Sequence, residues 1–322
     1  MKTAFLAAAT AFALVALSGL FVIPMLEMLK FGQTVRADGP KRHLKKTGTP
    51  TMGGIMIIPA IVLSTLLFYK GSYYTLMALL SAAGFGLIGF VDDYIKVVKK
   101  RSLGLRASQK LLFQITLSIL LAFFGLTFYP GTTKVFFPFI KGGIDIGLLY
   151  IPFTIFVIIG TVNSVNLTDG LDGLVSGISV IVGFAYTIIY FFLGMQDLAL
   201  FSSALSGACL GFLLYNRHPA RVFMGDTGSL GLGGAISALS VLGGTHFYLA
   251  FIGLVFILET LSVILQVAFF RTTGKRIFKM SPLHHHFELS GWSEVKVVSV
   301  FWIFTAISAI LGIAMFYLTE IY

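Results

Sequence analysis

Three groups of carboxylates stand out in a chain that is otherwise strongly apolar. Asp92 and Asp93 are adjacent and follow a glycine-rich apolar run, whereas Asp169 and Asp172 lie three residues apart in the segment VNLTDGLDGL. Asp226 lies in the glycine-rich segment FMGDTGSLGLGG. Acidic oxygens hold Mg²⁺ well, and basic groups beside them bind phosphate oxygens. Carboxylates interleaved with lysines therefore favour Mg²⁺-dependent phosphoryl transfer.

The two aspartate pairs allow different interpretations. Neighbours on a helix point about 100° apart, so we expect one of Asp92 and Asp93 to face substrate or metal and the other to orient it or cap a neighbouring element. The alternative is a charged helix end paired with Lys96. Asp169 and Asp172 share one face if their segment is helical, but the two glycines beside them make a turn equally plausible. Helix capping is the structural alternative for this pair.

The segment around Asp226 is rich in glycine just before an apolar run. Glycines let backbone N–H groups approach a phosphate, and a helix N-terminus favours anions. The segment lacks the GK[ST] ending of a Walker motif, and tight helix packing explains glycines near a membrane equally well. The surrounding basic residues, among them Lys46, Lys110, Arg217 and Arg221, have an alternative role in topology and attraction to anionic lipid.

Three consecutive histidines and one acid deep in an apolar run complete the polar inventory. His284, His285 and His286 cannot all face one ion from a regular helix, and without cysteine ligands or HExxH spacing a zinc enzyme is disfavoured. Pro282 predicts the start of a short helix on the membrane surface. We expect one or two of the histidines to donate to a sugar or phosphate, with surface histidine as the alternative. Glu259 either satisfies a kinked helix or lines a lipid groove.

The composition predicts an integral membrane protein. Of the 322 residues, 57% are hydrophobic and only 11% are charged, and mean hydropathy is +0.94. The single cysteine, Cys209, excludes an intramolecular disulfide. The net charge of +10 is spread over short loops, which favours membrane topology over nucleic-acid binding. We expect one membrane-embedded unit over residues 1–322, without a separate soluble domain.

The apolar runs predict an all-α polytopic fold with about ten transmembrane helices. Runs of about 20 residues, which cross roughly 30 Å of hydrocarbon, are expected at 3–29, 53–69, 73–95, 110–129, 148–164, 174–193, 198–215, 229–243, 247–270 and 297–319. One set of alternate loops then carries 19 of the 23 basic residues. By the positive-inside rule this face is cytoplasmic and both termini are periplasmic. The segment 134–147 predicts a small periplasmic hairpin.

All the polar motifs fall on the predicted cytoplasmic face, and together they resemble a known family. GTPTMGG, DDYIKV, NLTDGLDGL, FMGDTGSL and PLHHHFE occur in this order over essentially the whole chain. The chain is similar to the phospho-N-acetylmuramoyl-pentapeptide transferases (translocase I), within the polyprenyl-phosphate N-acetylhexosamine-1-phosphate transferase superfamily. The resemblance implies an inner-membrane homodimer that moves phospho-MurNAc-pentapeptide from UDP-MurNAc-pentapeptide to undecaprenyl phosphate. The implied products are lipid I and UMP, and the implied cofactor is Mg²⁺.

The same resemblance implies roles for individual residues. The catalytic set is Asp226 as Mg²⁺ ligand, with Asn166 beside it, and the pair Asp92 and Asp93. The nucleotide site is implied to comprise Asn166, Asp169, Gly170, Leu171 and Asp172, with Phe223 stacked on uracil. Further substrate contacts are implied for Lys46 and Thr51 in the first loop, Lys110 on the fourth helix, and His284, His285 and His286 over the sugar. Asn163 and Asn216 are polar supports whose contact with metal or phosphate is left open.

The chemistry expected of such a site is attack of a lipid phosphate oxygen on the β-phosphorus of the sugar nucleotide. A phosphate monoester is already mostly dianionic at neutral pH, so direct attack is favoured over an aspartyl-phosphate formed on Asp92. Two alternatives remain at this point. A related enzyme would use UDP-N-acetylglucosamine, although the PLHHHFE segment argues against it. A transporter would place its acids at mid-membrane, where only Glu259 is expected.

Overall fold

The computed structural model describes residues 1–29, 46, 48–99, 101, 104–128 and 133–322. Within them the chain forms twelve α-helices, one two-stranded sheet and two single helical turns. The α-helices are α1 (Lys2–Met28), α2 (Gly54–Leu67), α3 (Tyr73–Val97), α4 (Ala107–Phe128), α5 (Tyr150–Thr168), α6 (Leu174–Phe192), α7 (Gln196–Asn216), α8 (Gly225–Leu242), α9 (His246–Ile252), α10 (Leu254–Thr273), α11 (Leu283–Leu289) and α12 (Glu294–Phe316). The strands are β1 (Lys134–Phe137) and β2 (Ile140–Asp145), and the turns are η2 (Gly147–Leu149) and η3 (Tyr317–Ile321).

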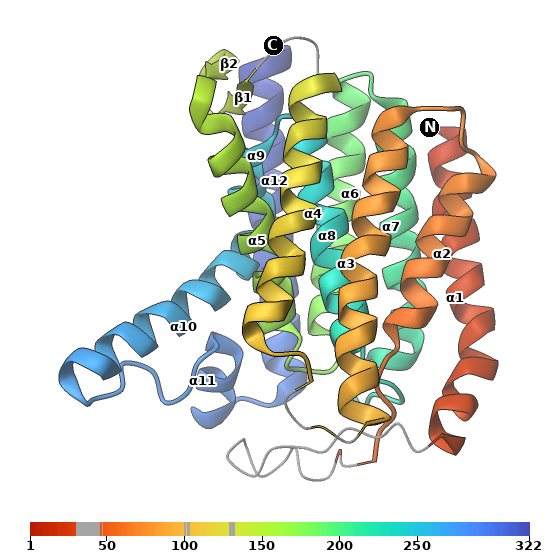
Figure 1. Ribbon diagram of the computed structural model, residues 1–322, viewed down its shortest axis with the longest axis vertical. Helices are drawn as coiled ribbons and strands as arrows, with labels where there is room; N and C mark the ends of the chain where they lie inside the picture. Colours follow the sequence, from red (N-terminus) through yellow and green to blue (C-terminus); the bar gives the residue numbers. More distant parts are fainter. Residues whose placement is uncertain (30–45, 47, 100, 102–103, 129–132) are drawn as a thin grey trace.

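The helices form one bundle whose long members, apart from α10, run roughly parallel to a common axis (Figure 1). Each of the ten predicted spans overlaps at least one α-helix in its described residues. Eight helical segments in the described part of the chain are long and apolar enough to cross a membrane, so the chain is a multi-pass membrane protein. The helix α2 has only 14 residues, and α8 is rich in glycine and serine. A count of ten spans therefore stays a prediction.

The ninth predicted span, 247–270, is not continuous. The short helix α9 ends at Ile252, and α10 begins at Leu254 after a break at Gly253. Glycine has little helix propensity because its backbone is the least restricted, which favours a break here. Beyond the break α10 leaves the bundle at a slant, so that α10 and α11 project to one side (Figure 1).

The two ends of the bundle differ in structure. Both chain termini and the β1–β2 hairpin lie at one end, whereas α11 and the polar loops lie at the other (Figure 1). The predicted hairpin is confirmed as an antiparallel pair in which Phe137 opposes Ile140. Its turn is at residues 138 and 139, and Gly142 and Gly143 lie within β2. Part of the first basic segment, residues 30–45, lies outside the described residues.

The helix α8 is the centre of the core, since every residue from Thr227 to Leu242 is buried. Its first turn is crossed closely by α2 and α3. A Cβ on Gly89 of α3 would overlap the carbonyl oxygen of Asp226, and a Cβ on Gly54 of α2 would overlap the backbone of Gly228. Small residues allow membrane helices to approach this closely. Gly89 therefore determines how near α3 comes to the acid at the start of α8, and Gly54 determines how near α2 comes.

We expect Gly89→Ala to destabilise the protein by about 1–3 kcal/mol, the range for overpacking a close contact. The added methyl group must push α3 away from the carbonyl of Asp226. Gly160→Ala on α5 is the matched control, because a Cβ there meets no atom within 4 Å. Thermal unfolding in detergent is the measurement. Equal midpoints for the two variants would contradict the close crossing.

Candidate active site

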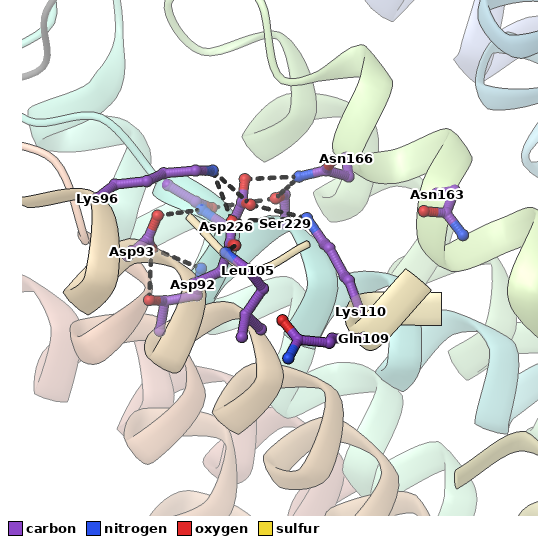
Figure 2. A network of polar contacts seen from close by, with 12 residues as sticks. Asp92, Asp93, Lys96, Leu105, Gln109, Lys110, Asn163, Asn166, Asp226 and Ser229 are labelled. Atoms are coloured by element: carbon purple, nitrogen blue, oxygen red, sulfur yellow. Dashed lines mark hydrogen bonds and ion pairs between the residues drawn. The ribbon is translucent and has the colours of Figure 1, made fainter. Parts of the chain in front are cut away.

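The acid Asp226 lies at the centre of a network of charged side chains (Figure 2). Its Oδ2 accepts from Lys96 Nζ at 2.9 Å and from Lys110 Nζ at 2.8 Å. Its Oδ1 accepts from Asn166 Nδ2 at 2.9 Å, and the same amide donates to Ser229 Oγ at 2.8 Å. Helices α3, α4, α5 and α8 thus meet at one carboxylate.

The adjacent acids of α3 have different partners, as their angular separation predicts. Asp93 Oδ1 accepts from the backbone N–H of Asp226 at 3.1 Å. Its Oδ2 accepts from the N–H and the hydroxyl of Thr227, at 2.8 and 2.7 Å. Because the first N–H groups of a helix have no partner within it, Asp93 caps α8 from a neighbouring helix. It thereby fixes the backbone that carries Asp226.

The other acid, Asp92, is also fully engaged. Its Oδ1 accepts from the backbone N–H of Leu105 at 2.7 Å, and its Oδ2 is 2.6 Å from Lys96 Nζ. The ammonium of Lys110 lies 3.8 Å from the same Oδ2. The alternative predicted from sequence, pairing of the acids with Lys96, is therefore present together with the network around Asp226. Lys96 connects Asp92 to Asp226.

The turn between α5 and α6 carries the second acidic motif. Asp169 caps the C-terminus of α5, and the turn continues to Gly173, whose φ is 80°. The segment is therefore a turn, one of the two conformations expected. Burial and the nearby carboxylates of Asp226, Asp93 and Asp172 raise the pKa of Asp169 to about 8. Asp169 thus lies close enough to the carboxylates of Asp226 and Asp93 to interact with them electrostatically.

A polar framework fixes this turn. Asn216 Oδ1 accepts from the backbone N–H of Gly173 at 3.1 Å and from Ser176 Oγ at 2.8 Å, while its Nδ2 donates to Val222 O at 3.0 Å. Both the oxygen and the nitrogen of the Asn216 amide therefore form hydrogen bonds within the protein. Asn216 joins the turn to the segment that precedes Phe223.

Two other predicted residues belong to a backbone pairing between the first loop and the start of α8. The N–H of Phe223 donates to Pro50 O, and the N–H of Gly53 donates to Phe223 O, both at 2.8 Å. Thr51 between them is buried. The Phe223 ring is partly exposed, so it can contact a ligand while its backbone is held.

Asn163 is not brought to the carboxylates. Its Nδ2 donates to Gln114 Oε1 at 2.9 Å and to the carbonyl of Ile159 at 2.8 Å. Figure 2 shows it apart from the network around Asp226. Its observed contacts join α5 to α4.

A second charged cluster lies around Lys46. Its Nζ is 2.7 Å from Asp172 Oδ1 and 2.6 Å from Glu294 Oε1. His218 Nδ1 lies 2.9 Å from Asp172 Oδ2 and 3.3 Å from Glu294 Oε2. Among the described residues, Asp172, His218 and Glu294 have ligand atoms within 4.8 Å of one another, as a metal site requires. The Lys46 ammonium already pairs with both acids, so it compensates the charge that a cation would otherwise neutralise.

The three histidines of α11 have three different environments. His284 is buried, and its imidazole lies against Gly170, where a Cβ would overlap Nε2. His285 Nδ1 is 2.9 Å from Glu288, and His286 Nδ1 accepts from the backbone N–H of Lys279 at 3.1 Å. The helix begins after Pro282, as predicted. His284 is thus the histidine seen against the turn that follows Asp169.

Glu259, whose role the sequence left open, supports this arrangement. Its carboxylate is fully buried. Oε1 accepts from the backbone N–H of His284 at 3.2 Å and lies 3.2 Å from the Nδ1 of the same histidine, within ion-pair distance but not aligned as a hydrogen bond. Glu259 therefore holds the start of α11 against α10.

Comparison with known proteins agrees with the sequence motifs. Residues 75–244 match the model of glycosyl transferase family 4. A protein of Thermoanaerobacter sp. (strain X514), named phospho-N-acetylmuramoyl-pentapeptide-transferase, is 56% identical over 307 residues, covering 95% of this chain and 96% of the relative. The chain therefore belongs to the family of the phospho-N-acetylmuramoyl-pentapeptide-transferases. Relatives of the same name from Caldanaerobacter subterraneus subsp. tengcongensis (53% identical, 92% of this chain and 93% of the relative) and Clostridioides difficile (strain 630; 49%, 94% of each) agree.

Several residues of this candidate site were not predicted as site residues. They are Lys96, Leu105, His218, Ser229 and Glu294. Lys96 was considered only as a pairing partner of the acids. A signal existed for Glu294, which is an acid at the start of a helix on the predicted cytoplasmic face. Its partner Lys46 is 248 residues away in sequence, so the pairing itself could not be predicted.

Removing the Asp93 cap should weaken the transferase fold at α8. We expect Asp93→Ala to lower the free energy of unfolding by about 1–3 kcal/mol, since three donors lose their acceptor. Thr227→Val removes only the hydroxyl donor and should cost less. Unfolding of both variants in detergent is the measurement. A Thr227→Val effect as large as that of Asp93→Ala would contradict the capping role.

Proposed function

We propose that this chain transfers phospho-MurNAc-pentapeptide from UDP-MurNAc-pentapeptide to undecaprenyl phosphate, giving lipid I and UMP. The observation that carries the proposal is the cluster of acids and lysines around Asp226, in a chain 56% identical over 95% of its length to a relative named for this activity. We further propose a homodimeric enzyme of the bacterial inner membrane. It would have ten spans in one unit, periplasmic termini and a cytoplasmic site.

The residues around Asp226 suit a divalent cation. Carboxylate and amide oxygens are the ligands Mg²⁺ prefers, and Asp226 and Asn166 would hold it, with Asp169 adjacent. Burial and the neighbouring carboxylates raise the pKa of Asp169 to about 8, so several acids lie close together here, as the oxygen ligands of a cation do. Mg²⁺ bound there would neutralise charge on the diphosphate and on the departing UMP.

The lysines of this cluster would bind the phosphates. Lys96 and Lys110 place two ammonium groups on Asp226 Oδ2, and either group can move onto a phosphate oxygen once substrate enters. Preorganised positive charge at the site where negative charge develops is usually the largest contribution to such catalysis. The turn at Asp169 to Asp172 and the ring of Phe223 would hold the nucleotide, with stacking on the base. His284 would face the sugar side.

The step proposed is direct attack by the lipid phosphate. An oxygen of that phosphate forms a bond to the β-phosphorus of the sugar nucleotide, and the bond from that phosphorus to the oxygen bridging it to UMP breaks. Both oxygens of Asp92 are engaged, by the Leu105 N–H and by Lys96. A carboxylate held in this way is a poor nucleophile, so Asp92 is assigned to orienting Lys96 and the lipid phosphate.

The test is transfer of radiolabelled MurNAc-pentapeptide from UDP to undecaprenyl phosphate by the purified protein. We expect transfer with Mg²⁺, none after chelation, and loss of turnover by at least about a hundredfold in Asp226→Ala, the scale for removing one group that stabilises transition-state charge. Asp197→Ala, at the start of α7, is the matched control and should stay within twofold of the wild type. Wild-type turnover in Asp226→Ala would remove this residue from the site. Absence of transfer by the wild type would overturn the function.

A further inference from the structure

Glu294 has more polar partners than a helix-terminal acid needs. It lies in the first turn of α12, where the Ser293 side chain already caps the helix by accepting from Lys296 N. Glu294 Oε1 accepts from Lys46 Nζ at 2.6 Å and from the backbone N–H of Asp172 at 2.8 Å. Its side chain is only 10% exposed. The carboxylate therefore points back into the protein, toward the turn that follows α5.

Asp172 completes the connection on the other side. Its Oδ1 pairs with Lys46 at 2.7 Å, and its Oδ2 accepts from the backbone N–H of Ala220 at 3.1 Å and lies 2.9 Å from His218 Nδ1. Both oxygens are thus used within the protein, and the side chain is 2% exposed. We call Lys46, Asp172, His218 and Glu294 the Lys46 cluster.

The Lys46 cluster joins four segments that are distant in sequence. They are the first loop, the α5–α6 turn, the segment between α7 and α8, and the start of α12. The segment between α7 and α8 leads directly to Phe223, whose backbone pairs with Pro50 close to Lys46. Removing one charge of a buried pair leaves the other uncompensated. Loss of Glu294 should therefore loosen both the turn and the segment that carries Phe223.

We propose that Glu294 is a positioning residue for the nucleotide. It acts through Lys46 and Asp172 to hold Gly170, Leu171 and Phe223 in their binding positions. This inference rests on the proposed function, in which these residues bind the UDP moiety. Within the described residues, no hydrogen bond or ion pair joins the Lys46 cluster to the carboxylate of Asp226. Glu294 consequently affects nucleotide binding and leaves the phosphoryl step nearly unchanged.

The test compares Glu294→Gln with Asp197→Asn. Both changes remove an acid from the first turn of a helix, so both lose the same favourable interaction with the helix dipole. Only the first acts on the Lys46 cluster. The measurements are the dissociation constant of UMP, by calorimetry on the full-length protein in detergent, and KM and kcat for the sugar nucleotide.

We expect Glu294→Gln to raise the UMP dissociation constant and KM about five- to tenfold, with kcat within about twofold of the wild type, because a buried charge partner is lost. Asp197→Asn should leave all three values within twofold. Glu294→Asp keeps the charge and should lie between the wild type and Glu294→Gln. This variant also keeps the test decisive if Glu294→Gln folds poorly.

Three results would overturn the proposal. The first is wild-type UMP affinity in Glu294→Gln while the wild-type protein binds UMP, which would leave the proposed function intact. The second is a loss of kcat without a change in KM. The third is that Mn²⁺, titrated alone and followed by electron paramagnetic resonance, binds to the wild-type protein but not to Glu294→Gln. The Lys46 cluster would then be a cation site. Failure of the wild type to bind UMP would instead overturn the proposed function together with this inference.

Discussion

The site depends on Asp226, which is held both by its side chain and by its backbone. The side chain of Asp226 pairs with Lys96 and Lys110, while its backbone N–H is bound by Asp93. The close crossing at Gly89 brings α3 near enough for both sets of contacts. Burying charge in a membrane protein is unfavourable unless each charge has partners, so the surrounding helices must place acids and lysines together. The orientation of α3, α4, α5 and α8 follows from that requirement.

The polar end of the bundle contains three groups of residues. The group around Asp226 is the one we propose to bind phosphate and cation. The Lys46 cluster holds the α5–α6 turn, and Glu259 holds His284 against the same turn. The Lys46 cluster and His284 contact the turn from Asp169 to Gly173, and the carboxylate of Asp226 acts electrostatically on Asp169. The two acids of this turn, Asp169 and Asp172, therefore have different environments. Asp172 is bound on both oxygens within the protein, whereas burial and the neighbouring carboxylates raise the pKa of Asp169.

Much of this arrangement could be predicted from the sequence. Hydropathy located ten helical segments because a membrane span needs a long apolar run, and the dense motifs identified the acids. The break at Gly253 was missed, since the apolar run continues through it. The pairing of Asn163 with Gln114 and of Glu294 with Lys46 was also missed. Such contacts are decided by helix packing over large sequence separations, on which local patterns carry no information.

The central claim is that the Asp92, Asp93 and Asp226 group organises charge and does not supply a nucleophile. The most direct measurement incubates the purified enzyme with UDP-MurNAc-pentapeptide and Mg²⁺ alone, and follows UMP after rapid quenching. Because Asp92 is engaged by the Leu105 N–H and Lys96, we predict that UMP stays far below the enzyme concentration until undecaprenyl phosphate is added. Release of UMP stoichiometric with the enzyme, before any acceptor is present, would contradict the claim.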